Sequence, residues 1–504
     1  MRHVTMTAVV VEVAVLASAL AYQVSTTHHA NQGGNDKPAT AATAAMAGTL
    51  APPLLAGCAW PVETTPAIGD VATLDPFATY WVTPFLAKPG DSITIRGAFP
   101  MSRFMSFAVY NDAFQLFTNK VRGKSVPSDL SDYQITPDRG TTNPWRTGHV
   151  RKGQRFTIRL LPVATAAQRR SENAIPMIDQ HPPATPSGPA GVGYVVFRAY
   201  IAADGSAAVQ LPTITVTRGG LSTTLPRCRP GSSSRPASTG SASGASASSA
   251  SASSALASAA VLDGLRDDGV AMSCTTRCAA PELQYFGPSA DSEAGLFPNP
   301  VNGYLEMAFT PKPGYVVVTH GLAPTSPGQA GGGTPGTSTG ASPVSWLNPA
   351  FQVRYWSISN YLGMQPYPVV EVGQGSAALV GATPDYLTTL KGGYYTVVSS
   401  LPSDKPSAAS LTAHAATWIP MSASHAATPE FQLLRNVLPQ HSSYPQGFAF
   451  ISAPANPSKI IGPAAVRRRM GAYYPQTAQC KVAVFETRGW AGCLAATRLA
   501  ATRA

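Results

Sequence analysis

Charged residues are scarce in this sequence: Asp, Glu, Lys and Arg make up 12% of its 504 residues, about half the share found in an ordinary soluble protein. Coiled coils and helical bundles need many Glu, Lys and Arg residues in heptads, so both classes are excluded. A hydrophobic content of 44% argues against disorder of the whole chain, which requires low hydrophobicity with high net charge. The length allows two or three domains, each large enough for a hydrophobic core.

Long hydrophobic runs are also lacking. The apolar stretch of residues 8–22 is interrupted by Glu12 and is too short for a comfortable membrane span. It follows a basic residue, Arg2, and contains the small-x-small pattern of Ala19 and Ala21. This layout predicts a signal peptide over residues 1–21. We therefore expect a secreted or cell-envelope protein whose mature chain has no membrane span.

Two low-complexity tracts divide the rest of the chain. Residues 22–57 are rich in Ala, Thr and Gly and predict a flexible leader, and residues 229–273 begin as a long Ser/Ala alternation and predict an interdomain linker. The remaining segments, 58–228 and 274–504, are expected to form two domains, the second with a basic C-terminal end.

The two segments repeat each other. Residues 76–100 align without gaps to residues 300–324, at a constant offset of 224. Both copies carry Lys-Pro-Gly between two apolar runs, at 88–90 and at 312–314, which is a tight-turn signal because Pro presets φ and Gly supplies a positive φ. Three further pairs match: 103–107 with 354–358, 155–162 with 394–402, and 196–198 with 433–435. A duplicated domain is the simplest interpretation.

The apolar runs are short, rich in β-branched and aromatic residues, and bounded by Gly, Pro or Asp. This pattern predicts an all-β protein of two tandem antiparallel β-sandwich or jelly-roll domains. Helical periodicity is confined to short pieces near the C-terminus, clearest at 463–472 and 492–501.

A family resemblance rests on three of these segments. The strand at 104–111, the loop Asn143-Pro144-Trp145 and the strand at 196–200 look like those of uncharacterised exported bacterial proteins similar to the domain of unknown function 1214. The resemblance implies a β-sandwich and export. It supplies no catalytic residue.

The six cysteines form an even set in an apparently exported chain, which favours disulfides. Cys58 and Cys278 open the two copies, and Cys228 and Cys480 end them, so we predict Cys58–Cys228 and Cys278–Cys480, with Cys274–Cys493 as the third pair. Two alternatives remain. Leu55-Ala56-Gly57-Cys58 has the form of a lipoprotein cleavage box, with lipid on Cys58. Cys274, Cys278, Cys480 and Cys493 could bind zinc, although short Cys-x2-Cys pairs are absent. We predict no metal and no cofactor.

Motifs for catalysis are weak. Ser338 lies in Gly-Thr-Ser-Thr-Gly, but neither a strand nor a helix flanks it, as a nucleophile elbow would require. No His-x-His or His-Glu-x-x-His pair is present, and no glycine-rich phosphate motif opens a helix.

One loop combines residue types that suit a ligand. A long loop carries acids, an amide, a Trp and guanidiniums, and such a set suits a sugar, whose ring stacks on an aromatic face while polar groups bind its hydroxyls. The candidate ligand-binding residues are Asp132, Asp138, Arg139, Asn143, Trp145 and Arg146. Two of the acids could also form a glycosidase pair. The structural alternative is that Trp145 caps the sandwich and the charges solvate the loop.

The positive charge is concentrated at the C-terminal end. Residues 459–504 hold eight Lys or Arg and one Glu, giving +7 of the total +11. An exported protein meets anionic envelope polymers or lipid headgroups rather than nucleic acid. The alternative is a basic face that is simply solvated. We therefore expect an exported, non-catalytic protein with a binding or structural role, whose partner is a polysaccharide or an anionic envelope polymer. The alternative is a secreted carbohydrate-active hydrolase that uses the 129–145 loop.

Overall fold

The protein is described here from a computed structural model. The structure describes residues 57–65, 74–111, 115–149, 151, 153–181, 192–203, 205–228, 299, 301–329, 341–346, 348–364, 367–368, 379–424, 428–440, 442–445, 447 and 463–501. The predicted signal peptide and nearly all of the leader, the linker at 229–273, Cys274, Cys278 and Ser338 lie outside the described residues.

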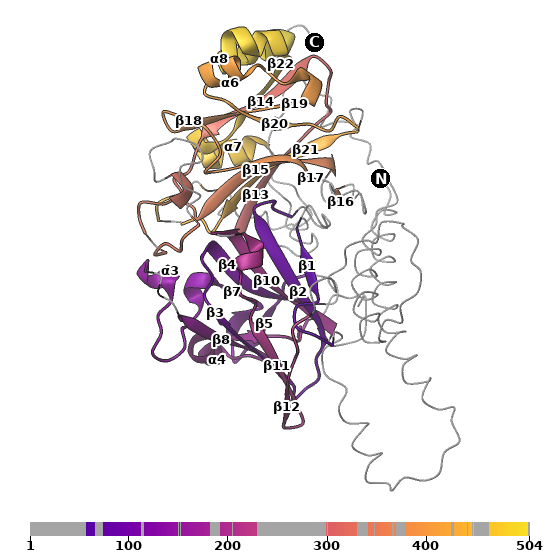
Figure 1. Cartoon of the computed structure of the whole chain (residues 1–504). Helices are drawn as coiled ribbons and strands as arrows, with labels where there is room; N and C mark the ends of the chain where they lie inside the picture. The colour runs from indigo at the N-terminus through magenta and orange to yellow at the C-terminus, as the bar shows by residue number, and fades with distance from the viewer. Residues whose placement is uncertain are drawn as a thin grey trace, which may run out of the picture.

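The first domain consists of two five-stranded sheets (Figure 1). One sheet has the order β1 (Val62–Thr64), β2 (Ala78–Leu86), β10 (Val192–Ala202), β4 (Ser102–Asn111) and β7 (Asp129–Ser131). The other has the order β12 (Leu221–Thr224), β11 (Thr213–Arg218), β3 (Ser92–Ala98), β8 (Arg155–Leu161) and β9 (Ala174–Pro176). A hairpin of β5 (Thr118–Val121) and β6 (Lys124–Pro127) lies beside them.

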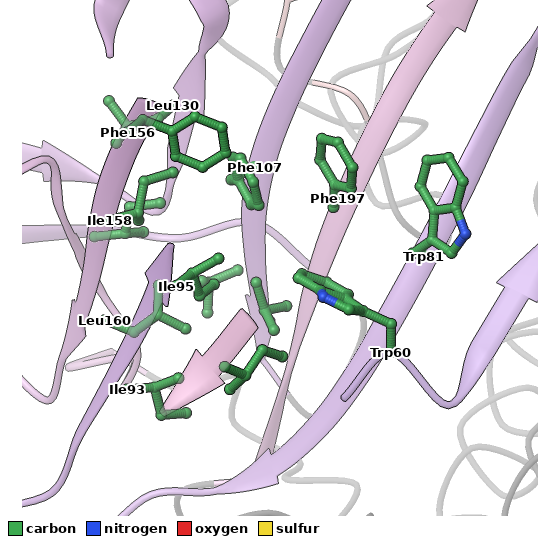
Figure 2. Close-up of a cluster of buried hydrophobic side chains, with 14 of the residues drawn as sticks. Trp60, Trp81, Ile93, Ile95, Phe107, Leu130, Phe156, Ile158, Leu160 and Phe197 are labelled. Carbon is green, nitrogen blue, oxygen red and sulfur yellow. The ribbon is translucent and has the colours of Figure 1, made fainter. Parts of the chain in front are cut away.

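Aromatic side chains fill the space between these two sheets (Figure 2). Phe197 of β10 stacks on Phe107 of β4, with ring centroids 4.8 Å apart, and on Trp81 of β2, at 5.2 Å. From the opposite sheet, Ile93 and Ile95 are fully buried against the same cluster. Residues two apart on each strand share this face, as the alternation of a strand requires, so the first domain is a β-sandwich.

The second domain repeats this plan. Its first sheet has the order β13 (Asn302–Phe309), β21 (Glu430–Val437), β15 (Tyr355–Met364) and β16 (Tyr367–Pro368), with β17 (Leu379–Pro384) also paired to β15. Its second sheet has the order β18 (Leu390–Lys391), β19 (Tyr394–Ser400), β14 (Tyr315–Leu322) and β22 (Gln476–Lys481), with β20 (Thr417–Pro420) paired in parallel to β19. The all-β prediction is confirmed.

The pairing registers show which strands correspond. In the first domain β10 lies between β2 and β4, and in the second β21 lies between β13 and β15. In the opposite sheets, β3 lies between β8 and β11, and β14 lies between β19 and β22. β9 pairs in parallel with β8, and β20 pairs in parallel with β19. The matches found between the two sequence segments therefore fall on strands at equivalent places in the two sandwiches.

Helices are few in the described residues. The α-helices are α3 (Pro144–Thr147), α4 (Ala166–Glu172), α6 (Ala408–Ala413), α7 (Pro463–Met470) and α8 (Val482–Ala501). The short 3₁₀ helices are η1 (Asp132–Gln134), η2 (Ser206–Ala208), η3 (Pro327–Gln329), η4 (Pro402–Asp404) and η6 (Gly471–Tyr473). Helices near the C-terminus were predicted, although α8 begins earlier than expected and bends at Gly489, where φ is +57°. In the described part of the chain, no helix has the length and apolar character to cross a membrane.

One predicted disulfide is confirmed and two are wrong. Cys58 is bonded to Cys228, so the start of the first domain is tied to its end. Cys480 is bonded to Cys493 and not to Cys278, which also excludes Cys274–Cys493. The reason is a difference between the copies: Cys480 lies within β22, opposite Val316, and the equivalent position in the first domain is Thr217 of β11. In the second domain α8 follows this strand where the first domain has β12, and Cys493 lies on α8.

The two disulfides close loops of different length and should differ in their stabilising effect. Chain entropy predicts about 5 kcal/mol for Cys58–Cys228, with a separation of 170 residues, and about 3 kcal/mol for Cys480–Cys493, with a separation of 13. We expect Cys58→Ser/Cys228→Ser to lower the free energy of unfolding more than Cys480→Ser/Cys493→Ser, as measured by urea denaturation of both double variants. The reverse order would show that local strain or packing outweighs loop entropy.

Candidate functional site

The candidate loop lies where the first domain meets the second. Asp132 begins η1, directly after β7, and Asn143 is the N-terminal cap of α3, which carries Trp145 and Arg146. The Asn143 side chain accepts a hydrogen bond from the Trp145 N–H at 2.8 Å and donates to the carbonyls of Asp132 and Ile135, both at 2.7 Å. Because all these bonds are internal, Asn143 fixes α3 against η1.

Asp132 is a buried structural ion. Its carboxylate lies 2.9 Å from Nη1 of Arg354, which belongs to the second domain, and neither side chain is exposed. The backbone N–H groups of Met105 and Tyr133 also donate to it, at 3.2 and 2.6 Å. Burial raises the pKa of Asp132 to about 6, since it outweighs the opposing charge of Arg354 and these hydrogen bonds. The carboxylate is therefore ionised at neutral pH and is engaged with the other domain.

Trp145 is buried, with no exposed surface. Its Nε1–H donates to the carbonyl of Arg103 at 3.0 Å, and its ring packs edge-to-face on Phe99 with centroids 5.9 Å apart. An aromatic ring stacks on a sugar only through an exposed face, so this position gives no support to the sugar-stacking role expected for Trp145. It agrees with the structural alternative, in which Trp145 caps the sandwich.

The other three candidates lie outside this buried cluster. Asp138 is half-buried, and Arg139 and Arg146 are exposed. The Arg146 guanidinium donates to the backbone carbonyls of Tyr133 and Gln134, at 2.6 and 2.8 Å, and so closes the loop on itself. The structure thus brings Asp132, Asn143 and Trp145 together, with Arg146 exposed beside them on α3 and bonded to η1.

A second buried ion pair mirrors the first. Arg103 of the first domain donates through Nη1 to both carboxylate oxygens of Asp385 in the second, at 2.6 and 2.5 Å, and neither side chain is exposed. Ser326 Oγ donates to the same carboxylate at 2.5 Å, and the Tyr386 N–H donates at 2.8 Å. Burial raises the pKa of Asp385, against the lowering effect of Arg103.

The two ion pairs are related by the repeat. Arg103 is the second residue of β4, and Arg354 directly precedes the equivalent strand, β15. Asp132 directly follows β7, and Asp385 directly follows β17. These two strands are equivalent, since Ser131 pairs with Ser106 of β4 and Pro384 pairs with Ser357 of β15. Each domain therefore supplies its arginine to the other domain's aspartate. Sequence reasoning identified Asp132 but missed Asp385, although the dipeptide Asp-Tyr occurs at both 132–133 and 385–386.

The connection between β14 and β15 is much longer than the one between the equivalent strands β3 and β4, and residues 325–349 form an insertion in the second copy. Described residues of this insertion close the junction. A Cβ on Gly328 of η3 would lie 2.6 Å from Nη2 of Arg103 and 2.7 Å from Oδ1 of Asp385, so only glycine allows the backbone to approach the ion pair this closely. Farther along, the Trp346 N–H donates to the carbonyl of Trp145 at 2.7 Å, and the Arg354 guanidinium lies 4.5 Å from the Trp346 ring centroid. The insertion peculiar to the second copy therefore binds the first domain.

Asp75 adds a third charged contact between the domains. It accepts hydrogen bonds from the hydroxyls of Tyr355 and Ser357, both at 3.0 Å, and lies 3.9 Å from Nη1 of Arg435. Around it runs an apolar cluster from both domains, in which Tyr200 and Tyr355 meet edge-to-face with centroids 5.6 Å apart. The domains are therefore joined by a continuous buried interface.

The clearest exposed feature of the second domain is a row of arginines on α7. Val466 and Met470 of this helix are buried in the second sandwich, whereas Arg467, Arg468 and Arg469 are exposed. Arg467 lies over the ring of Tyr474, 5.1 Å from its centroid. Lys481, Arg488 and Arg498 are also exposed, on β22 and α8. In the described residues no group of three His, Cys, Asp or Glu side chains could hold a metal.

The reciprocal ion pairs predict how the free energy of unfolding changes when one charge, or both charges, of a pair are removed. Asp385→Asn removes the carboxylate charge beside buried Arg103 and should lower the free energy of unfolding by about 3–5 kcal/mol. The double variant Arg103→Met/Asp385→Leu should lose less, because it removes both buried charges. Urea denaturation of these variants measures both values.

The exposed pair Arg159–Glu172 provides the control, since its side chains are 42% and 36% exposed. Glu172→Gln should cost no more than about 1 kcal/mol. If Asp385→Asn had an effect as small as that of Glu172→Gln, the ion pair would not determine how the domains associate.

Comparisons with known proteins do not identify the chain. No protein-family model and no curated protein matches it. Among solved structures, an uncharacterised protein from Burkholderia cenocepacia aligns with 84% of this chain and 82% of its own, at 12% identity and a TM-score of 0.41. A protein from Vibrio parahaemolyticus aligns with 73% of this chain and 86% of its own, at 9% identity and a TM-score of 0.34. Likenesses at this level establish neither family nor function, and the resemblance to the domain of unknown function 1214 stays a prediction.

Proposed function

We propose that this is an exported, non-catalytic protein of the cell envelope or the extracellular space that binds an anionic envelope polymer through its basic C-terminal end. The exposed arginine row Arg467–Arg469 is the observation that carries the proposal. Adjacent guanidiniums on a helix whose other side is anchored in the core present positive charge at a fixed place. Such an array attracts an anionic polymer electrostatically.

Two features of the chain support export. The disulfide Cys58–Cys228 ties the start of the first domain to its end, and Cys480–Cys493 ties β22 to α8. Disulfides of this kind persist in oxidising compartments outside the cytoplasm. They agree with the signal-peptide pattern at the start of the sequence.

The position of the candidate catalytic acid supports a binding role over hydrolysis. Asp132 is held by Arg354 and by two backbone N–H groups, with no exposed surface. A general acid or nucleophile must reach the glycosidic bond of its substrate. As part of the domain interface, Asp132 serves to hold the two sandwiches together.

A binding experiment with a defined polymer tests the proposal. We expect the purified protein to bind polygalacturonate, an anionic polysaccharide, and not neutral dextran, with binding that weakens as salt rises. Arg468→Glu/Arg469→Glu should weaken binding roughly tenfold or more by loss of this attraction. Arg467 is left in place because it packs on Tyr474. Biolayer interferometry at two salt concentrations measures both effects.

A charge-matched control is available in the first domain. Lys120 and Lys124 are exposed on the β5–β6 hairpin, so Lys120→Glu/Lys124→Glu changes the net charge equally at another place. Equal weakening by both double variants would show a general charge effect and overturn the α7 assignment. Cleavage of the polysaccharide during the experiment would overturn the non-catalytic role.

A further inference from the structure

The interior of the second sandwich contains a polar layer that the first sandwich lacks. By pairing register, Ile95, Val109, Leu160 and Val195 of the first domain correspond to Thr319, Asn360, Ser399 and Gln432 of the second. All eight side chains are fully buried. Four core positions that are apolar in the first copy are thus polar in the second, and buried polar groups weaken a core unless they are hydrogen-bonded.

The four polar side chains form one hydrogen-bonded network. Thr319 Oγ1 donates to Gln432 Oε1 at 2.6 Å, and Gln432 Nε2 donates to Asn360 Oδ1 at 2.9 Å. Both amide groups also donate to Ser399 Oγ, each at 3.1 Å. The layer is therefore ordered and links β14, β15, β19 and β21 across the sandwich.

Glu430 lies on the same face of β21, two residues before Gln432, and none of its surface is exposed. Its Oε1 accepts the Ser422 N–H at 2.7 Å, whereas its Oε2 has no hydrogen-bond partner. The equivalent residue in the first domain is Gly193, where a Cβ would lie 2.5 Å from the Phe85 ring. The second copy thus has a carboxyl group where the first copy has no room for a side chain.

No ionic partner faces this carboxyl group from the elements around it in the described residues. On the neighbouring strands, Glu306 of β13 pairs with Leu433, and Arg435 lies five residues along β21. Alternation along a strand puts both on the opposite face of the sheet from Glu430. From the facing sheet, β14 and β19 present Thr319 and Ser399 to the interior. Burial raises the pKa of Glu430 to about 8, opposed only by the Ser422 N–H.

We propose that Glu430, two residues before the polar layer on β21, is a proton-sensitive switch, in which loss of the Glu430 proton opens the end of the second sandwich where β21 begins. With its proton, the neutral carboxyl group remains inside and holds Ser422 of the segment between β20 and β21. Without it, a charge with no ionic partner is left in the interior. The carboxylate then reaches water only if the segment from Met421 to Ser424 moves away.

The raised pKa of Glu430 determines how the stability of the protein changes with pH. The pKa of Glu430 is higher in the folded protein than the ordinary value of 4.5, so the folded state holds a proton that the unfolded state releases. The contribution of this group to stability is therefore fully present below pH 4.5 and is lost progressively as pH rises to about 8. Glu430→Gln, which mimics the neutral acid in size and shape, should remove this pH dependence.

Hydrogen exchange of the full chain tests the switch. Between pH 6 and pH 9, we expect exchange of the Ser422 amide and its neighbours to accelerate at least tenfold beyond its intrinsic pH dependence. In Glu430→Gln the additional acceleration should be absent. His425 lies close in sequence, outside the described residues, and a histidine side chain ordinarily has a pKa near 6.5, so His425→Gln serves as the control and should behave as the original chain does.

The results expected above would support the switch, and the following results would contradict it. Additional acceleration that persists in Glu430→Gln, or that disappears in His425→Gln, would overturn the proposal. If Glu430→Gln does not fold, infrared spectroscopy of the original chain gives a second test. The C=O band of a protonated carboxyl group should disappear over the same pH range as the segment opens. Opening without a change in that band would also overturn the proposal.

Discussion

The reciprocal exchange of arginine and aspartate between the domains is the constraint on which the arrangement depends. Arg103 has its carboxylate partner, Asp385, in the other domain, and the reverse holds for Arg354 and Asp132. A buried charge without its partner is strongly destabilising. A shift of one domain relative to the other would break both ion pairs and lower the free energy of unfolding twice over. The two ion pairs add little net stability, because removing the charges from water offsets their attraction. Their main effect is to favour one relative position of the two similar sandwiches.

The sequence predicted the fold well where local chemistry determines it. Lys-Pro-Gly recurs because a tight turn needs those residues in both copies, and the turns place β3 and β14 at equivalent positions. Cys58–Cys228 was predictable because it closes a complete domain. The pairing of Cys480 was not, since the copies diverge after β22, where a helix replaces a strand. An alignment of the copies carries no information about a segment that only one of them possesses.

Asp132, Asn143 and Trp145 show why the candidate site was harder to predict. Acids, amides and an indole suit a sugar, and they equally suit a buried interface in which their polar groups bond to other parts of the protein. Composition does not distinguish these environments, because the groups that contact these residues come from distant strands of the first sandwich and, for Asp132, from the second domain. The Trp145 carbonyl accepts a hydrogen bond from the N–H of Trp346, and Asp132 is paired with Arg354, two partners that lie beyond the linker. The recurrence of the arginine and of Asp-Tyr in both copies was the one available signal.

The same interface explains how the two sandwiches could diverge in their interiors. The first has aliphatic residues at the four positions where the second has its polar layer, and a glycine where the second has a buried acid. Domains that share buried ion pairs and a common apolar cluster unfold cooperatively, so the stability of one supports the other. The first sandwich can therefore offset the cost of polar groups in the second.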